Sequence, residues 1–208
     1  MIDLETANDD LNFDEFSSDQ PMPPSDVVTY NELRSCADLY RMYKSGKLEI
    51  QPDFQRDVVW SNDAQTRFID SLVKCLPIPS MCFGLDYKTQ RLKVIDGLQR
   101  MSSIVKFLDE KEWRLSSLDD IYEPLQNKTN IELKNGSDIE KNIYSQVQDM
   151  AVPITIIRSD FSKAPHLRYL FTIFHRLNSG GVRLNNQEIR NCIYSGEFNN
   201  FLKSFDKN

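Results

Sequence analysis

The chain has 208 residues and a formal charge of −6, with 25 Lys and Arg against 31 Asp and Glu. This length is enough for one substantial domain, or two small ones, with a hydrophobic core. Neither a signal peptide nor an apolar run long enough to span a bilayer is present, which argues against a membrane protein and predicts a cytoplasmic one.

The cysteine and histidine content excludes further classes. The four cysteines show no Cys-x-x-Cys spacing, which is typical of proteins from a reducing compartment. The two histidines, His166 and His175, are too few to assemble a zinc site or a His-based metal nuclease within this chain. A Walker-type Gly-x-x-x-x-Gly-Lys-Ser/Thr loop is also missing, which excludes an ordinary P-loop nucleotidase.

Residues 1–26 differ in charge from the rest of the chain. They carry eight acidic and no basic groups, so residues 27–208 carry 25 basic and 23 acidic groups, a charge of +2. Because the segment is rich in proline at its end and poor in apolar residues, we expect a disordered acidic tail before a folded domain over 27–208. Two roles stay open for this tail: a solvated leader, or a nucleic-acid mimic that occupies a basic cleft of the domain.

The domain is predicted to begin with a helix. Thr29 and Glu32 have the spacing of a capping box, so a helix is expected from there to about Gly46. A short strand follows at 48–50. Pro52 then favours an edge strand or an irregular loop.

A second helix and a hairpin are expected next. Ser61 should cap the helix, which two prolines end before residue 80. Residues 81–87 and 91–95 predict a hairpin with its turn at 88–90. The helix that follows should bury a stripe formed by Leu98, Met101, Ile104, Val105 and Leu108.

The pattern weakens over residues 112–150, which are predicted to be an insertion. Trp113 and Leu115 favour a short strand there. The polar stretch 127–138 contains an Asn-Gly turn, and a short helix is expected at about 139–147.

The last third of the chain returns to clear elements. Residues 152–158 predict a strand, and Pro165 starts a helix that ends in the loop from Asn178 to Gly181. A final helix is expected from Asn185 to about Gly196. Because hairpins occur together with strand and helix alternation, the predicted fold class is compact α+β.

The junction at residues 96–100 is the most informative local pattern. Asp96 can cap the following helix, and Gln99 has the spacing to reach back to the cap. Arg100, however, places a cation at the positive end of the helix dipole, which costs up to about 1 kcal/mol unless a negative group lies there. A phosphate bound by the free N–H groups of Gly97 to Gln99, with Arg100 over it, would remove this conflict.

Three separated segments carry a resemblance to a known family. They are residues 51–60, which include Gln55, Arg56 and Trp60, then residues 95–100, and residues 174–190. In this order and spacing they resemble the N-terminal domain family of GmrSD-type, modification-dependent restriction systems, which is related to the ParB and sulfiredoxin fold. The resemblance covers roughly residues 28–203 and implies a small mixed sheet flanked by helices.

The resemblance also implies a function in bacterial defence against phage. The family is associated with binding and hydrolysis of nucleoside triphosphates and with coupling to a nuclease domain. For this chain it implies a nucleoside triphosphate and Mg²⁺ as cofactors, and DNA, a nuclease or both as partners.

The resemblance implies which residues form the site, and the needs of hydrolysis suggest their roles. Asp96 or Glu188 would position a water or a metal ion, and Arg56 or Arg100 would stabilise charge on the γ-phosphate. The predicted catalytic residues are Asp96, Arg100 and Glu188, with Asp96 as the expected Mg²⁺ ligand. The implied nucleotide-binding residues are Gln55, Arg56, Gly97, Gln99, Arg100, Arg176, Asn178, Gly181 and Arg190.

The chain departs from the family pattern at two positions. Leu98 stands where a second glutamine is usual, which removes one hydrogen-bonding group from the loop. His175 stands where an acid is expected, which weakens a metal or base site.

Simpler roles remain open for the same residues. Asp96 and Gln99 can act as caps alone, and Arg56 or Arg176 can form surface ion pairs worth ~0–1 kcal/mol. Trp60 is expected to be a packing anchor. For the whole chain, the alternative to a nucleotide-dependent restriction component is a non-catalytic, ParB-like nucleotide- or DNA-binding switch or adaptor.

Overall fold

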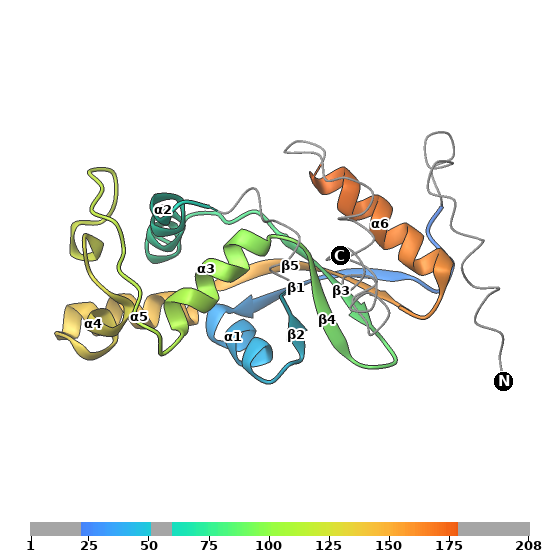
Figure 1. The fold of residues 1–208 in the computed structure, drawn as a ribbon, viewed down its shortest axis with the longest axis horizontal. Helices are drawn as coiled ribbons and strands as arrows, with labels where there is room; N and C mark the ends of the chain where they lie inside the picture. The colour runs from blue at the N-terminus through green and yellow to red at the C-terminus, as the bar shows by residue number, and fades with distance from the viewer. Residues whose placement is uncertain (1–21, 51–59, 179–208) are drawn as a thin grey trace, which may run out of the picture.

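The computed structural model describes residues 22–50 and 60–178 of the chain (Figure 1). Five strands form one mixed sheet in the order β1-β5-β3-β4-β2. The strands are β1 (Val28–Ser35), β2 (Leu48–Glu49), β3 (Met81–Asp86), β4 (Arg91–Asp96) and β5 (Ala151–Ser159). The helices are α1 (Cys36–Lys44), α2 (Asn62–Val73), α3 (Leu98–Leu108), η3 (Glu123–Leu125), α4 (Asn130–Asn135), α5 (Asp138–Asp149) and α6 (Ala164–Asn178).

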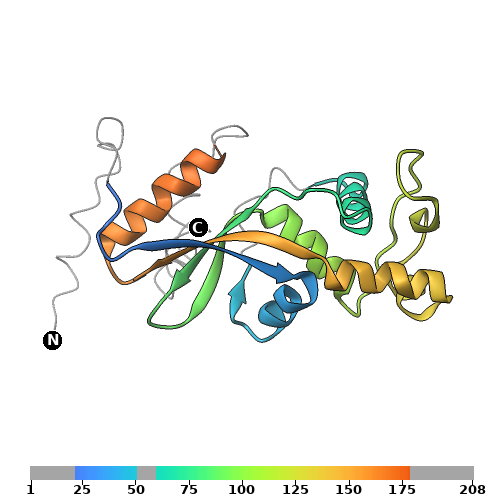
Figure 2. The same cartoon turned by 180° about the vertical axis from the view of Figure 1, so that it is seen from behind.

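The sheet combines parallel and antiparallel pairs. β5 pairs with β1 in the antiparallel sense along all eight residues of β1, and Figure 2 shows the two strands side by side. β3 is parallel to β5, and β2 is parallel to β4, whereas β3 and β4 form the predicted antiparallel hairpin. This arrangement confirms the predicted compact α+β fold.

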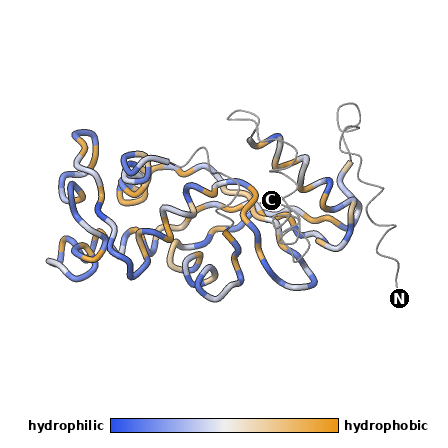
Figure 3. Tube along the Cα trace, in the orientation of Figure 1, coloured by the Kyte–Doolittle hydropathy of each residue, from blue (hydrophilic) through white to orange (hydrophobic). Residues whose placement is uncertain are grey.

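The main hydrophobic core lies between one face of the sheet and helices α1, α2, α3 and α5. Phe83 and Ile154 supply fully buried side chains from the sheet, and Met101, Ile104 and Phe107 supply them from α3. Each such side chain contributes about 1.5–3 kcal/mol of burial free energy. Apolar residues accordingly follow the strands, while the turn of the β3–β4 hairpin is hydrophilic (Figure 3).

A smaller hydrophobic cluster lies between the other face of the sheet and α6. Cys82, Ile157 and Leu170 form its buried centre, and Ile95 of β4 and Ile173 of α6 pack against it. The helix predicted to begin at Pro165 is therefore confirmed, and it packs on the sheet face opposite to α3.

The helix predicted from Thr29 is wrong over its first half. Residues 28–35 form strand β1, and the helix begins only at Cys36, where the side chain of Ser35 accepts a hydrogen bond from the backbone N–H of Asp38. The capping-box spacing at Thr29 is a local signal, whereas all eight residues of this segment pair in register with β5. Tertiary pairing thus overrides a local helix signal.

The predicted insertion at 112–150 contributes to the main core. Trp113, Leu115 and Leu133 are buried in it. The strand expected at Trp113 and Leu115 is reduced to a single bridge between Arg114 and Thr129. The polar stretch contains helix α4, while the helix expected at 139–147 is confirmed as α5.

Asn130 organises the chain between α3 and α4. Its buried amide group donates hydrogen bonds to the carbonyls of Phe107, Asp109 and Lys111 at 3.0–3.2 Å, and its Oδ1 accepts one from the N–H of Trp113 at 2.8 Å. One side chain therefore pairs with four backbone groups at the end of α3 and in the segment that follows it.

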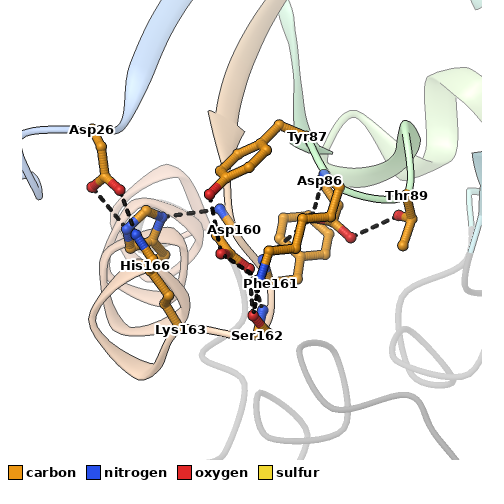
Figure 4. A network of polar contacts seen from close by, with 10 residues as sticks. Asp26, Asp86, Tyr87, Thr89, Asp160, Phe161, Ser162, Lys163 and His166 are labelled. Carbon is orange, nitrogen blue, oxygen red and sulfur yellow. Dashed lines mark hydrogen bonds and ion pairs between the residues drawn. The ribbon is translucent and has the colours of Figure 1, made fainter.

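A polar network fixes the start of α6 against the β3–β4 hairpin (Figure 4). The carboxylate of Asp160, the residue directly after β5, accepts hydrogen bonds from Ser162 and from the hydroxyl of Tyr87, and it pairs with Lys88 at 3.0 Å. The hydrogen bond from the Ser162 hydroxyl and the contact with Lys88 hold the pKa of Asp160 well below its usual range.

The same network reaches the segment before β1. The imidazole of His166 is buried; its Nδ1 accepts from the backbone N–H of Asp160, and its Nε2 faces Asp26 at 3.0 Å. Asp26 also pairs with Lys163 at 2.6 Å. Asp26, which the charge pattern placed in the acidic tail, is therefore anchored to α6, whereas residues 1–21 lie outside the described part of the chain.

We expect acid to destabilise this network. Because the pKa of Asp160 is lower in the folded than in the unfolded chain, its contribution is present above the unfolded pKa of 3.8 and is lost as the pH falls below it. The free energy of unfolding, measured with urea, should decline between about pH 5 and pH 2, and less steeply in Asp160→Asn. The exposed Asp119→Asn should keep the wild-type slope; an unchanged slope in Asp160→Asn would contradict the assignment.

Candidate functional site

The signature residues 95–100 lie where β4 passes into α3. Cys82 pairs with Asp96 and Phe83 pairs with Val94, so one residue of β4, Ile95, is extra at this point. Such a bulge turns the strand and changes the face on which the next side chain lies. Because cross-strand partners share a face, Asp96 lies on the α6 side of the sheet with Cys82, whereas Val94 packs against the main core.

Gly97 forms the turn from strand to helix. It is the N-cap residue of α3, has φ of 92°, and makes no side-chain capping bond. A methyl group at this position would lie 2.5 Å from Cγ and 2.9 Å from Cβ of Met81. Glycine is therefore required both for its backbone conformation and for the close approach of β3.

The interpretation of Asp96 as the helix cap is wrong. Asp96 is the last residue of β4, and its Oδ2 accepts a hydrogen bond from Nη2 of Arg100 at 2.9 Å. The bulge and the left-handed Gly97 separate Asp96 from the cap position. Its carboxylate instead forms an ion pair with Arg100 in the first turn of α3.

Arg100 is held in place by three groups. Besides Asp96, its Nη1 donates to the backbone carbonyl of Pro79 and lies 3.5 Å from that of Ser80. The side chains of Arg100 and Asp96 are 15% and 28% exposed, so the pair lies in the surface layer. The negative group expected near Arg100 is therefore supplied by the chain itself, and the dipole argument alone does not require a phosphate.

A hydrogen bond of Gln99 links the signature loop at residues 95–100 to the end of the first motif, residues 51–60. Its Oε1 accepts a hydrogen bond from the backbone N–H of Trp60 at 3.1 Å. The ring of Trp60 packs edge-on against Phe68 of α2 at 5.7 Å between centroids, as expected of a packing anchor. Sequence reasoning did not identify this contact, because the two residues are 39 positions apart.

The third motif, residues 174–190, begins on α6. Ile173 of α6 and Ile95 of β4 belong to the same hydrophobic cluster, so the helix that carries Arg176 packs beside the signature loop's own strand. Arg176 is exposed, and α6 ends at Asn178. The other predicted residues, Gln55, Arg56, Gly181, Glu188 and Arg190, lie outside the described residues.

The thiol beside Asp96 is not a nucleophile at neutral pH. Burial, and then the negative charge of Asp96, raise the pKa of Cys82 to about 12. Because the thiolate is the reactive form, this thiol stays protonated and unreactive at neutral pH.

Asp96 fits the predicted role in Mg²⁺ binding only together with further ligands. Over residues 22–50 and 60–178, no group of three or more His, Cys, Asp or Glu side chains is placed to hold a metal ion. Mg²⁺ is commonly bound by one or two carboxylates plus phosphate oxygens of a nucleotide. Asp96 alone could supply one such carboxylate, and the remaining ligands would have to come from the nucleotide or from outside the described residues.

Gly97→Ala should be markedly more destabilising than Gly46→Ala. Both glycines have positive φ, but a methyl group at Gly46 meets nothing within 4 Å, whereas at Gly97 it meets Met81. We expect a loss of about 2–3 kcal/mol in the free energy of unfolding at Gly97 and about 1 kcal/mol at Gly46. Urea denaturation of both variants measures the difference, and equal losses would show that Met81 moves aside freely.

Comparison with known proteins supports the resemblance seen in the three motifs. Residues 36–195 match the family described as GmrSD restriction endonuclease, N-terminal domain. The chain matches none of the curated proteins and none of the solved structures with which it was compared. Among the described residues, no helix has the length and apolar character needed to cross a membrane. The matched segment includes all three motifs, and the chain belongs to the GmrSD restriction endonuclease N-terminal domain family.

Proposed function

We propose that this chain is the nucleotide-binding module of a DNA restriction system, and that it binds a nucleoside triphosphate at the N-terminus of α3. The observation that carries the proposal is that Arg100, in the first turn of α3, has its guanidinium group fixed beside the strand-to-helix turn. Arg100 is positioned by Asp96 and by two backbone carbonyls, so little side-chain entropy remains to be lost when it meets an anion.

The backbone around Gly97 supports the same proposal. The first intrahelical bond of α3 runs from Met101 to Gly97, so the N–H groups before Met101 point out of the helix end, where anions bind favourably. A glycine at this turn also lets a phosphate approach the backbone closely. Arginine in turn offers a planar fork of donors that matches phosphate oxygens.

Asp96 would take a second role once a nucleotide is bound. Phosphate oxygens compete with its carboxylate for Arg100, and a carboxylate released from that pair fits a Mg²⁺ ion that neutralises the phosphates. Asp96, with Glu188 as the predicted second acid, would hold the ion, and Arg100 would stabilise charge on the terminal phosphate.

A non-catalytic switch is the second candidate function. The exchange of Arg100 between Asp96 and a phosphate would be a local two-state element, which is what a nucleotide switch requires. Binding without turnover would then be enough to change the affinity for a nuclease partner or for DNA.

The test of both candidates is a titration of the purified chain with each of the four nucleoside triphosphates, with and without Mg²⁺. At least one triphosphate should raise the melting temperature, and by more than its monophosphate does. Release of phosphate with turnover supports hydrolysis, whereas stabilisation without turnover supports the switch. The absence of stabilisation by any of the four would contradict both.

A further inference from the structure

A row of side chains crosses the sheet in register with Asp96. Asn31 of β1 pairs with Thr155 of β5, Thr155 pairs with Cys82 of β3, and Cys82 pairs with Asp96 of β4. Paired residues on neighbouring strands share a face, so all four lie on the α6 side of the sheet. At about 4.8 Å per strand the row spans roughly 14 Å.

Uncharged polar groups extend from the signature loop along this row. Thr155 Oγ1 donates a hydrogen bond to Oδ1 of Asn31 at 2.8 Å, and Ser80 Oγ lies 3.1 Å from Thr155 Oγ1. Ser80 is also the residue whose carbonyl faces Arg100. The three side chains are therefore linked by hydrogen-bond contacts, and the backbone carbonyl of Ser80 lies 3.5 Å from Nη1 of Arg100.

The hydrogen-bonded row of side chains offers N–H donors for a ligand at its Asn31 end. Because Oδ1 of Asn31 is occupied by Thr155, the Nδ2 group is turned away from Thr155, and it has no hydrogen-bond partner among the described residues. Asn31 and Ser80 are exposed, and Thr155 is half-buried. On the same face of β1, two residues on, Leu33 is 71% exposed.

We propose that Asn31, Thr155 and Ser80 form the subsite for the uncharged part of the nucleotide, its sugar hydroxyls and base. This inference rests on the proposed function, because it places the phosphates at Gly97 and Arg100. The hydroxyl and amide groups carry no charge, so they suit a sugar or a base edge and not a further phosphate. Exposed Leu33 offers an apolar surface for the face of a base, and the length of the row is comparable with that of an extended nucleoside triphosphate.

The test compares a nucleoside triphosphate with inorganic tripolyphosphate by titration calorimetry. Asn31→Ala and the near-isosteric Thr155→Val should each weaken binding of the nucleotide by about tenfold, the loss expected for one hydrogen-bonded group. Both should leave the affinity for tripolyphosphate unchanged. The exposed Asn135→Ala on α4 serves as the matched control and should leave both affinities at wild-type values.

Four results would overturn the inference. Equal weakening for both ligands would show that the row acts through the phosphates or the fold, and unchanged nucleotide affinity would show that the nucleoside lies elsewhere. If the wild-type chain binds tripolyphosphate as tightly as the nucleotide, the nucleoside adds no affinity. The proposed subsite would then be wrong, whereas the proposed phosphate site would stand. If the wild-type chain binds neither ligand, the proposed function falls as well.

Discussion

Replacing Arg100 with alanine should abolish the stabilisation that we propose a nucleoside triphosphate would give to this chain. Arg100 is the cation at the N-terminus of α3 in the described structure, and a phosphate bound there would lose its bidentate partner. The ligand-free variant should also be less stable than wild type, by about 1–2 kcal/mol, because the contacts with Asp96 and two carbonyls are lost. The sequence alone predicts a variant about as stable as wild type or slightly more so, since a lone cation facing the helix dipole should be unfavourable.

Arg67→Ala is the matched control for this experiment. Arg67 lies on α2 and pairs with Asp120 at 2.8 Å, in an exposed ion pair outside the signature loop. Thermal unfolding with and without ligand should show a normal ligand-induced shift for this variant and none for Arg100→Ala. A ligand-induced shift of wild-type size in Arg100→Ala would contradict the assignment of the phosphate site.

Replacing Asn130 with alanine should cause the largest loss of stability among these changes, about 4 kcal/mol. The variant loses three hydrogen bonds to carbonyls and leaves the N–H of Trp113 without its acceptor, and a buried unsatisfied group costs about 1–3 kcal/mol. Asn130→Asp should be at least as damaging, because a carboxylate would face three carbonyl oxygens.

Asn135→Ala, at the exposed end of the same helix, is the control and should change the free energy of unfolding by less than about 0.5 kcal/mol. Urea denaturation at neutral pH provides the comparison. Similar losses at the two positions would mean that the turn after α3 is held by packing alone.

The hairpin and helix α3 could be predicted because their signals are local. The turn at residues 88–90 separates two apolar runs, and the helical spacing of Met101, Ile104 and Leu108 matches the buried side of α3. The segment at 28–35 could not be assigned in this way. Its role as a strand depends on β5, more than a hundred residues later in the chain.

The region 127–140 contained a signal that the sequence analysis did not use. Thr129 with Glu132 and Ser137 with Glu140 both have the capping-box spacing, and both boxes form in the structure, at the starts of α4 and α5. The same spacing at Thr29 predicted a helix where the structure has strand β1. A capping box therefore predicts a helix reliably only where no strand partner competes for the backbone.

The candidate site was predicted in composition but not in geometry. Asp96, Gly97, Gln99 and Arg100 do meet at one turn, as their spacing indicated. The bulge at Ile95 places Asp96 on the α6 side of the sheet. It depends on the register with β3, so no local sequence pattern predicts it. The contact between Gln99 and Trp60 likewise arises only from the fold.

The most direct test of the central claim is an amide NMR titration with a non-hydrolysable nucleoside triphosphate and Mg²⁺. If the triphosphate binds at the N-terminus of α3, the largest shift changes should fall on the backbone N–H groups of residues 97–100, with smaller ones at Trp60 through Gln99. Shift changes that leave residues 97–100 unaffected, or no changes at saturating ligand, would contradict the account.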